Sequence, residues 1–174
     1  MTAVRLAQRI LQLAETVGAV LLARRLTLAT AESCTAGGVA YAVTQVAGSS
    51  GWFDRGFVTY SNAAKRQVLG VDAADLHAHG AVSEAVAQAM ARGALAASDA
   101  QIAVGITGIA GPGGSSAAKP VGLVCFGWAL RRRGEVRLRA ATHRFSGDRA
   151  AVRSHAIVVA LEGLLQTISE DDDA

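Results

Sequence analysis

The sequence predicts a single three-layer α/β/α domain, in which helices cover both faces of a mixed, mostly parallel sheet. Segments typical of strands and helices alternate over the first two thirds of the chain, an order that produces parallel strands joined by helices. Two consecutive strand-like segments near the C-terminus predict an antiparallel hairpin followed by a long helix. A length of 174 residues, 51% of them hydrophobic, suffices for one domain with a substantial core.

Each expected element rests on hydrophobic periodicity or on a cap. In chain order they are a helix at 3–24, a strand at 26–30, a helix at 38–46, a strand at 52–60 and two helices at 63–69 and 83–95. Three strands follow at 100–107, 121–130 and 135–145, and the last helix runs from 147 to 168. The first helix has one apolar face, which we expect to pack across the sheet. Ser83 is a good cap for the alanine-rich helix that follows it. The segments 71–80 and 108–120 are expected to be loops.

The middle of the chain carries clear boundary signals. The segment 52–60 is rich in aromatic and β-branched residues, which favour strands. Ser61 or Asn62 suits the cap of the next helix, and Gly70 suits its end. An arginine-rich turn joins the two strands of the expected hairpin.

Charge is distributed unevenly along the chain. The net charge is +3, but an acidic tail at 169–174 holds four of the 14 acidic residues, so the domain at 1–168 carries about +7. With few aromatic residues among the basic ones and no nucleic-acid motif, we expect most arginines to form a solvated face and do not expect nucleic acid as a partner. An anionic small molecule stays open as a ligand. The arginines concerned are Arg131, Arg132, Arg133, Arg137, Arg139, Arg144, Arg149 and Arg153.

The sequence also bears on location and cofactors. The apolar stretch from Ile10 to Ala23 is interrupted by polar residues, and we judge it too short and too polar to span a membrane. No secretory cleavage pattern follows it, so we expect a cytoplasmic protein. Cys34, Cys125 and the four histidines lack metal-ligand spacing. We therefore expect no metal and no other cofactor.

The segment Thr30-Ala-Glu-Ser-Cys-Thr-Ala-Gly-Gly38 places Ser33 where an apolar strand turns into a helix. Unpaired N–H groups at a helix start can bind a phosphate or an oxyanion, so Ser33 is a candidate nucleophile. The alternative is that Ser33 or Thr35 only caps the helix. Glu32 either accepts a hydrogen bond from a substrate or organises the turn, and we expect Cys34 to be buried.

Polar groups follow the other expected strands as well. With Asn62 as the cap, Lys65 falls in the first helical turn, where the helix dipole and burial favour its neutral form. An exposed surface lysine is the alternative. The glycine-rich loop 108–120 allows close backbone approach to a ligand, although a flexible linker would have a similar composition.

Six motifs in order carry a resemblance to a known family: AESCTAGG, AGSSGWFDRGFVTYSNAAK, HGAVSE, GITGIAGPGG, KPVG and FSGDR. The chain resembles the CinA C-terminal domain family over residues 5–165, and specifically its stand-alone nicotinamide mononucleotide deamidases. One departure is visible. Where family members often carry Gly-Pro-Asp-Gly-Gly, this chain has Gly111-Pro-Gly-Gly-Ser115, so an acidic group is missing.

The resemblance implies hydrolysis of nicotinamide mononucleotide to nicotinic acid mononucleotide and ammonia, without a metal, in pyridine nucleotide salvage. It implies that Ser33 is the nucleophile and Lys65 the base, that Tyr60 lies beside them, and that Thr107 and nearby backbone N–H groups bind the oxyanion. It also implies a homo-oligomer. The candidate substrate-binding residues are Glu32, Cys34, Thr35, Gly108, Gly111 and Arg149, the last as a phosphate ligand.

Four alternatives stay open from the residues themselves. Tyr60 could be a core aromatic with its hydroxyl at the rim. Arg149 could be a surface arginine beside Asp148. The whole chain could be a nucleotide-binding or interaction domain without turnover. It could also hydrolyse a different amide, which the altered loop at 113–115 would permit.

Overall fold

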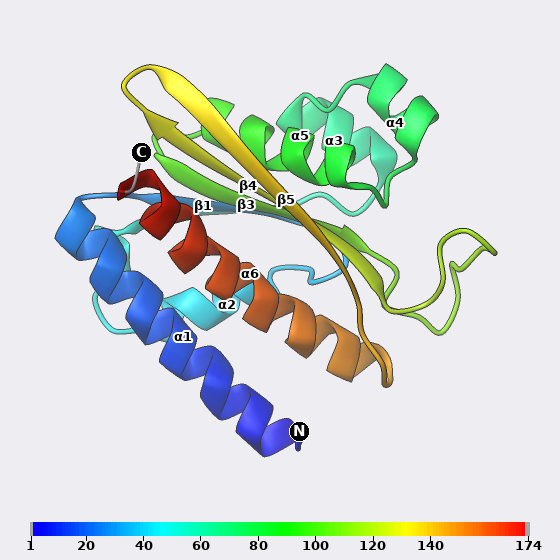
Figure 1. The fold of residues 1–174 in the computed structure, drawn as a ribbon, viewed down its shortest axis with the longest axis horizontal. Coiled ribbons are helices and arrows are strands. Elements are labelled where there is room, and N and C mark those ends of the chain that lie inside the picture. Colours follow the sequence, from blue (N-terminus) through cyan, green and yellow to red (C-terminus); the bar gives the residue numbers. More distant parts are fainter. Residues whose placement is uncertain (1, 173–174) are drawn as a thin grey trace.

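The chain forms six α-helices and five strands over residues 2–172, the residues that the computed structural model describes (Figure 1). In order they are α1 (Ala3–Arg24), β1 (Leu28–Glu32), α2 (Gly38–Thr44), the 3₁₀ turn η1 (Ser49–Gly51), β2 (Phe53–Val58), α3 (Asn62–Leu69), α4 (Ala73–His79), α5 (Glu84–Ala96), β3 (Ile102–Gly108), β4 (Leu123–Arg132), β5 (Glu135–Arg144) and α6 (Arg149–Asp172).

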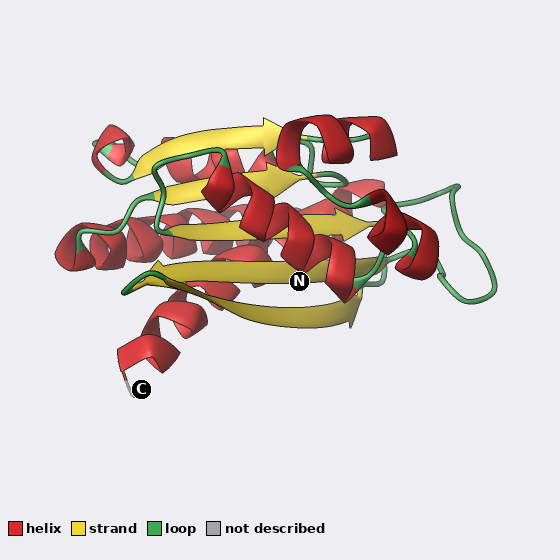
Figure 2. Ribbon diagram, turned by 90° about the horizontal axis from the view of Figure 1, so that it is seen from above, coloured by secondary structure: helices red, strands yellow, loops and turns green. Residues whose placement is uncertain are grey.

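The five strands form one mixed sheet in the order β2-β1-β3-β4-β5. β1 pairs in parallel with both β2 and β3, while β3, β4 and β5 pair in antiparallel fashion. In Figure 2 the arrowheads of β2, β1 and β3 therefore lie at the same edge of the sheet. The predicted fold class and its C-terminal hairpin and long helix are confirmed.

Helices cover both faces of this sheet, each over its own apolar core. Figure 1 shows α1, α2 and α6 on one side and α3, α4 and α5 on the other. The first core includes Trp52, Phe126 and Trp128, and the second centres on Met90. α1 was expected to pack across the sheet, but its main partners are α6 and α2. The apolar face of α1 is thus covered largely by other helices.

Two glycines let α5 lie directly on the sheet. Gly105 of β3 and Gly127 of β4 are partners in register. A Cβ atom at Gly105 would lie 2.2 Å from the carbonyl oxygen of Ala87, and one at Gly127 would lie 2.4 Å from the backbone nitrogen of Gln88. Any larger residue at either position would push α5 away, so these glycines set the thickness of this layer.

Several boundaries differ from those expected. β1 begins two residues later than predicted and ends at Glu32, so Ser33 follows the strand directly. The helix α4, capped by Asp72, replaces part of the expected loop 71–80. The sequence did not reveal it because seven residues are too few to show helical periodicity. Ser83 caps α5, as predicted. Ser61 caps α3, which was one of the two predicted options.

The last helix also extends beyond the expected end at 168. Asp171 belongs to α6 and lies 3.1 Å from Arg132 and 3.2 Å from Arg137. Glu170 lies 3.8 Å from Arg139. Part of the expected acidic tail therefore pairs with hairpin arginines that we had assigned to a solvated face.

Two helices resemble membrane spans by composition. α1 and α6 are long and apolar enough to cross a bilayer by that measure, contrary to the reading of the N-terminal stretch as too short and too polar. In the folded chain they pack against each other, and Leu13, Val17 and Leu161 are buried there. Part of the apolar surface of each helix is therefore buried in the core, while Val4, Leu11 and Leu22 of α1 stay exposed.

Candidate active site

The site lies at the edge where the three parallel strands end. Backbone pairing continues one residue past β1 on both sides, because Ser33 N–H donates to Ile106 O at 2.9 Å and Thr59 N–H donates to Glu32 O at 2.9 Å. Ser33 is thus held against β3, and the segment after β2 is held against the end of β1. The carboxyl ends of parallel strands converge in this way at many binding sites of α/β proteins.

A serine hydroxyl and a lysine amine meet at this edge. Lys65 Nζ lies 3.0 Å from Ser33 Oγ. Only 1% of Lys65 and 8% of Ser33 is exposed. Lys65 projects inward from α3, whose cap is Ser61 and not Asn62, so Lys65 ends the first turn. The alternative of an exposed surface lysine is wrong.

The surroundings of Lys65 favour its neutral form. Nζ donates to Thr59 O at 2.9 Å and to Tyr60 O at 3.3 Å. Among residues 2–172, no carboxylate forms an ion pair with it. Burial lowers the pKa of the Lys65 amine from its ordinary 10.5. Nζ also donates to Ser33 Oγ, and once the amine is neutral its lone pair can accept the proton of that hydroxyl at the same distance.

Glu32 organises the turn after β1. It is fully buried, and its carboxylate accepts hydrogen bonds from Val39 N–H at 3.0 Å and Ala40 N–H at 2.9 Å. Glu32 therefore occupies the start of α2, which we had expected to bind a substrate anion. That expectation is wrong for these two N–H groups, because a charge from the chain itself already satisfies them.

The turn offers other donors to an oxyanion. Within the described residues, the N–H of Thr35 donates to no protein acceptor, and the N–H of Cys34 has only the sulfur of its own side chain as a partner. Gly37 caps α2 without a side-chain hydrogen bond, so the alternative that Ser33 or Thr35 serves as the cap is wrong. The donors nearest Ser33 thus belong to the turn that precedes the helix.

This turn is strained. Ala36 has a φ of 50° and Gly37 a φ of 86°. Left-handed backbone costs a non-glycine residue roughly 1–2 kcal/mol. Ala36 N–H donates to Ser33 O at 3.1 Å, which closes the turn. The neighbouring structure must hold Ala36 in this conformation.

The side chains of Cys34 and Thr35 lie away from solvent. Cys34 packs in the core, as expected, and burial raises the pKa of its thiol to about 11. A thiol with that pKa stays protonated near neutral pH and is a poor nucleophile. Thr35 is fully buried, and its carbonyl accepts hydrogen bonds from Gly38 N–H at 3.0 Å and Arg153 Nη2 at 2.9 Å. Both residues were expected to bind substrate, and with their side chains buried only their backbone groups could do so.

Thr107 is directed to another partner. It is 1% exposed, and its hydroxyl donates to Ala81 O at 2.8 Å. A hydroxyl has one proton, so in this arrangement it cannot also donate to an oxyanion. The expected role as an oxyanion donor does not agree with this geometry. Thr107 instead ties the end of β3 to the segment before α5.

Tyr60 and Arg149 form the rim of the site. Tyr60 is 60% exposed, so it is not a core aromatic, and its hydroxyl accepts a hydrogen bond from Arg149 Nη2 at 3.0 Å. Its contact with Lys65 is through the backbone carbonyl alone. Arg149 Nη1 donates to Gly111 O at 2.9 Å. Asp148 instead caps α6 through Ala151 N–H at 2.8 Å, so it does not neutralise Arg149.

The glycine-rich loop has a mixed role. Gly111 has a φ of 81° and brings its carbonyl to Arg149. Gly108 ends β3, and a Cβ atom there would lie 2.8 Å from Leu123 O. Gly108 therefore permits close packing against β4, whereas Gly111 takes part in the rim.

Arg153 was missed as a site residue. The sequence did carry a signal, because Arg153 follows Arg149 by four residues and therefore lies on the same helical face. Its partner, Thr35 O, lies 118 positions away and had no local signature.

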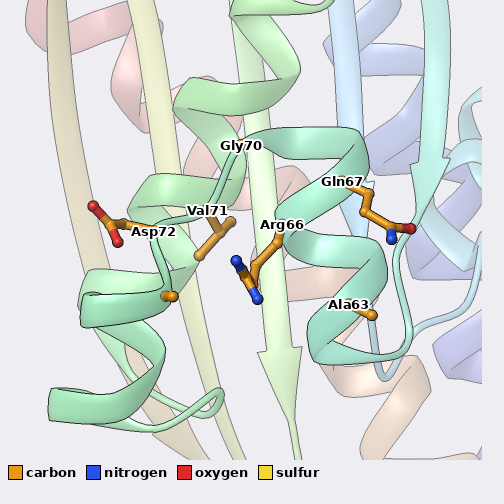
Figure 3. A pocket seen from close by; sticks show the side chains of 7 residues that line it. Ala63, Arg66, Gln67, Gly70, Val71 and Asp72 are labelled. Atoms are coloured by element: carbon orange, nitrogen blue, oxygen red, sulfur yellow. The ribbon is translucent and has the colours of Figure 1, made fainter.

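The hollow in Figure 3 lies outside this site. It has a volume of about 480 Å³ and includes Ala63, Arg66, Gln67 and Asp72 in its lining. Ser33 and Lys65 do not line it. Over residues 2–172, no three His, Cys, Asp or Glu side chains gather so that they could hold a metal ion.

The fold and the site define a class: a three-layer α/β protein with a buried serine–lysine contact at the carboxyl edge of its parallel strands. The CinA C-terminal domain family matches residues 10–168. The chain belongs to this family.

Two relatives are named nicotinamide-nucleotide amidohydrolase PncC. The one from Enterobacter agglomerans is 51% identical over 91% of this chain and 95% of its own length. The one from Escherichia coli K12 is 54% identical over 90% of this chain and 93% of its own length. Among solved structures, competence/damage inducible protein CihA from Agrobacterium tumefaciens is 46% identical, with a TM-score of 0.85 over 91% of this chain and 94% of that one.

Replacing Lys65 with methionine should stabilise the fold. With a lowered pKa in the folded state, Lys65 costs stability at neutral pH, and stability rises as pH increases between the folded pKa and 10.5, where the unfolded chain binds more protons. Lys65→Met should raise the free energy of unfolding at pH 7 by roughly 1 kcal/mol, measured by urea denaturation. Arg66→Met, at the exposed neighbouring position, is the control and should give no such gain. A Lys65→Met variant that is less stable than wild type would contradict the claim that burying this amine without an ion pair costs stability.

Proposed function

We propose that this chain is a cytoplasmic amidohydrolase that converts nicotinamide mononucleotide and water to nicotinic acid mononucleotide and ammonia, as a step in pyridine nucleotide salvage. The observation that carries the chemistry is the 3.0 Å contact between Ser33 Oγ and the buried Lys65 Nζ. The choice of substrate is supported by the names of the relatives.

The proposed reaction has two halves. Neutral Lys65 takes the hydroxyl proton as Ser33 Oγ attacks the carboxamide carbon, and the N–H groups of Cys34 and Thr35 face the developing oxyanion. Lys65 then gives its proton to the nitrogen, the C–N bond breaks and ammonia leaves. Water attacks the acyl-enzyme while Lys65 accepts its proton. That proton returns to Ser33 Oγ as the carboxylic acid product is released, and the acid gives its remaining proton to solvent to become the carboxylate.

Arg149 is the proposed ligand of the substrate phosphate. Its two hydrogen-bond partners, Gly111 O and Tyr60 Oη, are neutral, so the guanidinium keeps its full charge. It also stands at the first position of α6, where the helix dipole favours an anion. Both effects would add to the binding of a phosphate at the rim.

Ammonia release tests this function. Wild type should release ammonia from nicotinamide mononucleotide, in the presence of a chelator, and not from nicotinamide, nicotinamide riboside or NAD. Ser33→Ala and Lys65→Ala should lower kcat at least about 10³-fold, since each removes a group that acts on the reacting atoms. Arg66→Ala is the matched control, at an exposed position adjacent to Lys65, and should retain turnover.

Other outcomes identify the alternatives. Binding of the mononucleotide by folded wild type without ammonia release would indicate a domain that does not turn over its ligand. Ammonia from another amide alone would indicate a different substrate. Turnover that survives in Ser33→Ala would exclude the proposed nucleophile.

We also propose that the chain forms a homo-oligomer, as its resemblance to the family implies. An apolar hollow of about 500 Å³ between α1, α2 and α6 would suit contact with a second copy. Tyr41 lines it and is 69% exposed. Sedimentation equilibrium should give a mass above 17.8 kDa for wild type and a smaller mass for Tyr41→Glu. A wild-type monomer at micromolar concentration would contradict this proposal.

A further inference from the structure

Arg153 contacts the turn that carries the nucleophile. It projects from the second turn of α6, is partly buried, and donates from Nη2 to Thr35 O at 2.9 Å. Its Nε is buried without a hydrogen-bond partner, and within residues 2–172 no carboxylate pairs with the side chain. Among residues 2–172, the one acceptor of Arg153 is therefore a backbone carbonyl two residues after Ser33.

The contact acts next to the strained residue of the turn. Thr35 O belongs to the peptide unit that leads into Ala36, whose φ is 50°. The N–H of the same peptide unit donates to Ser33 O at 3.1 Å. Arg153 thus fixes one side of this peptide while Ser33 fixes the other. Conformations of this kind persist only where several contacts determine them together.

We propose that Arg153 is a positioning residue for the reaction at Ser33: by holding Thr35 O, it keeps the turn in the strained conformation that aligns Ser33 Oγ with Lys65 and leaves the Cys34 and Thr35 N–H groups free for the oxyanion. This inference rests on the proposed function for its kinetic test. It assigns Arg153 a task different from that of Arg149, one helical turn earlier.

The contacts of the two arginines separate those tasks. Arg149 is exposed and binds Tyr60 Oη and Gly111 O at the rim, where a ligand can reach it. Arg153 has its Nε buried and its Nη2 committed to the turn. Loss of Arg149 should therefore affect substrate binding, and loss of Arg153 should affect the chemical step.

Steady-state kinetics with nicotinamide mononucleotide test the proposal. Arg153→Met should lower kcat about 10- to 100-fold and leave KM unchanged, because a misplaced nucleophile slows chemistry without weakening binding. Adding Ala36→Gly to this variant should restore most of kcat, since glycine adopts a positive φ without strain. Ala36→Gly alone completes the double-mutant cycle. Arg9→Met removes an arginine from an exposed ion pair with Glu162 and is the control, with unchanged kcat.

A second readout does not depend on the natural substrate. A fluorophosphonate probe reacts when Ser33 Oγ forms a bond to phosphorus, fluoride leaves and the hydroxyl proton passes to Lys65. Arg153→Met should slow this labelling by about the same factor as kcat, and Ala36→Gly should restore it. If wild type is labelled but releases no ammonia from the mononucleotide, the proposed function fails while the role of Arg153 is still tested by labelling.

Three results would overturn the proposal. A raised KM with unchanged kcat would make Arg153 a substrate contact. Unchanged kinetics and labelling would leave it without a role in positioning. A lowered kcat that Ala36→Gly does not restore would exclude the turn as its route of action. If Arg153→Met melts below the assay temperature, Arg153→Lys is the second variant. We expect an intermediate loss of kcat in that variant, because lysine keeps a charged donor.

Discussion

The site depends on a lysine amine that is removed from water and given no opposite charge. Burying this amine in its charged form is costly, so burial favours the neutral form. Two carbonyls and a hydroxyl are within hydrogen-bond distance of the amine. The arrangement needs several elements at once. β2 must end beside β1 so that Thr59 O and Tyr60 O face inward, and the Ser61 cap must start α3 so that Lys65 falls on its inner face. The parallel β2-β1-β3 order is what brings these pieces to Ser33.

The charged groups around this amine are kept apart by separate partners. The Glu32 carboxylate accepts hydrogen bonds from two N–H groups at the start of α2, and among the described residues it forms no ion pair with Lys65. Arg149 lies at the exposed rim of the site. Arg153 donates a hydrogen bond to the turn after Ser33. At the far end of α6, Asp171 pairs with arginines of the hairpin. One helix thereby joins the rim, the turn and the edge of the sheet.

The sequence predicted what local patterns can encode. Helical periodicity and caps located α1 and α5, and the strand-to-helix transition located Ser33. Contacts between distant segments were the main source of error. Nothing local distinguishes a glutamate that caps the next helix from one that binds substrate, as with Glu32, or shows that Thr107 would bond to Ala81 O. α4 is too short to show a period, and the pairing of hairpin arginines with Asp171 joins residues more than 30 positions apart.

The neutral state of Lys65 is the central claim, and the chain permits a direct measurement because Lys65 and Lys119 are its two lysines. Lysine labelled with ¹³C at the ε carbon should give two NMR signals, and Lys65→Met identifies the one from Lys65. That signal should titrate below the ordinary pKa of 10.5, in wild type without substrate. Titration of the Lys65 signal at 10.5 or above would contradict the lowered pKa, and with it the proposal that Lys65 acts as the base for Ser33.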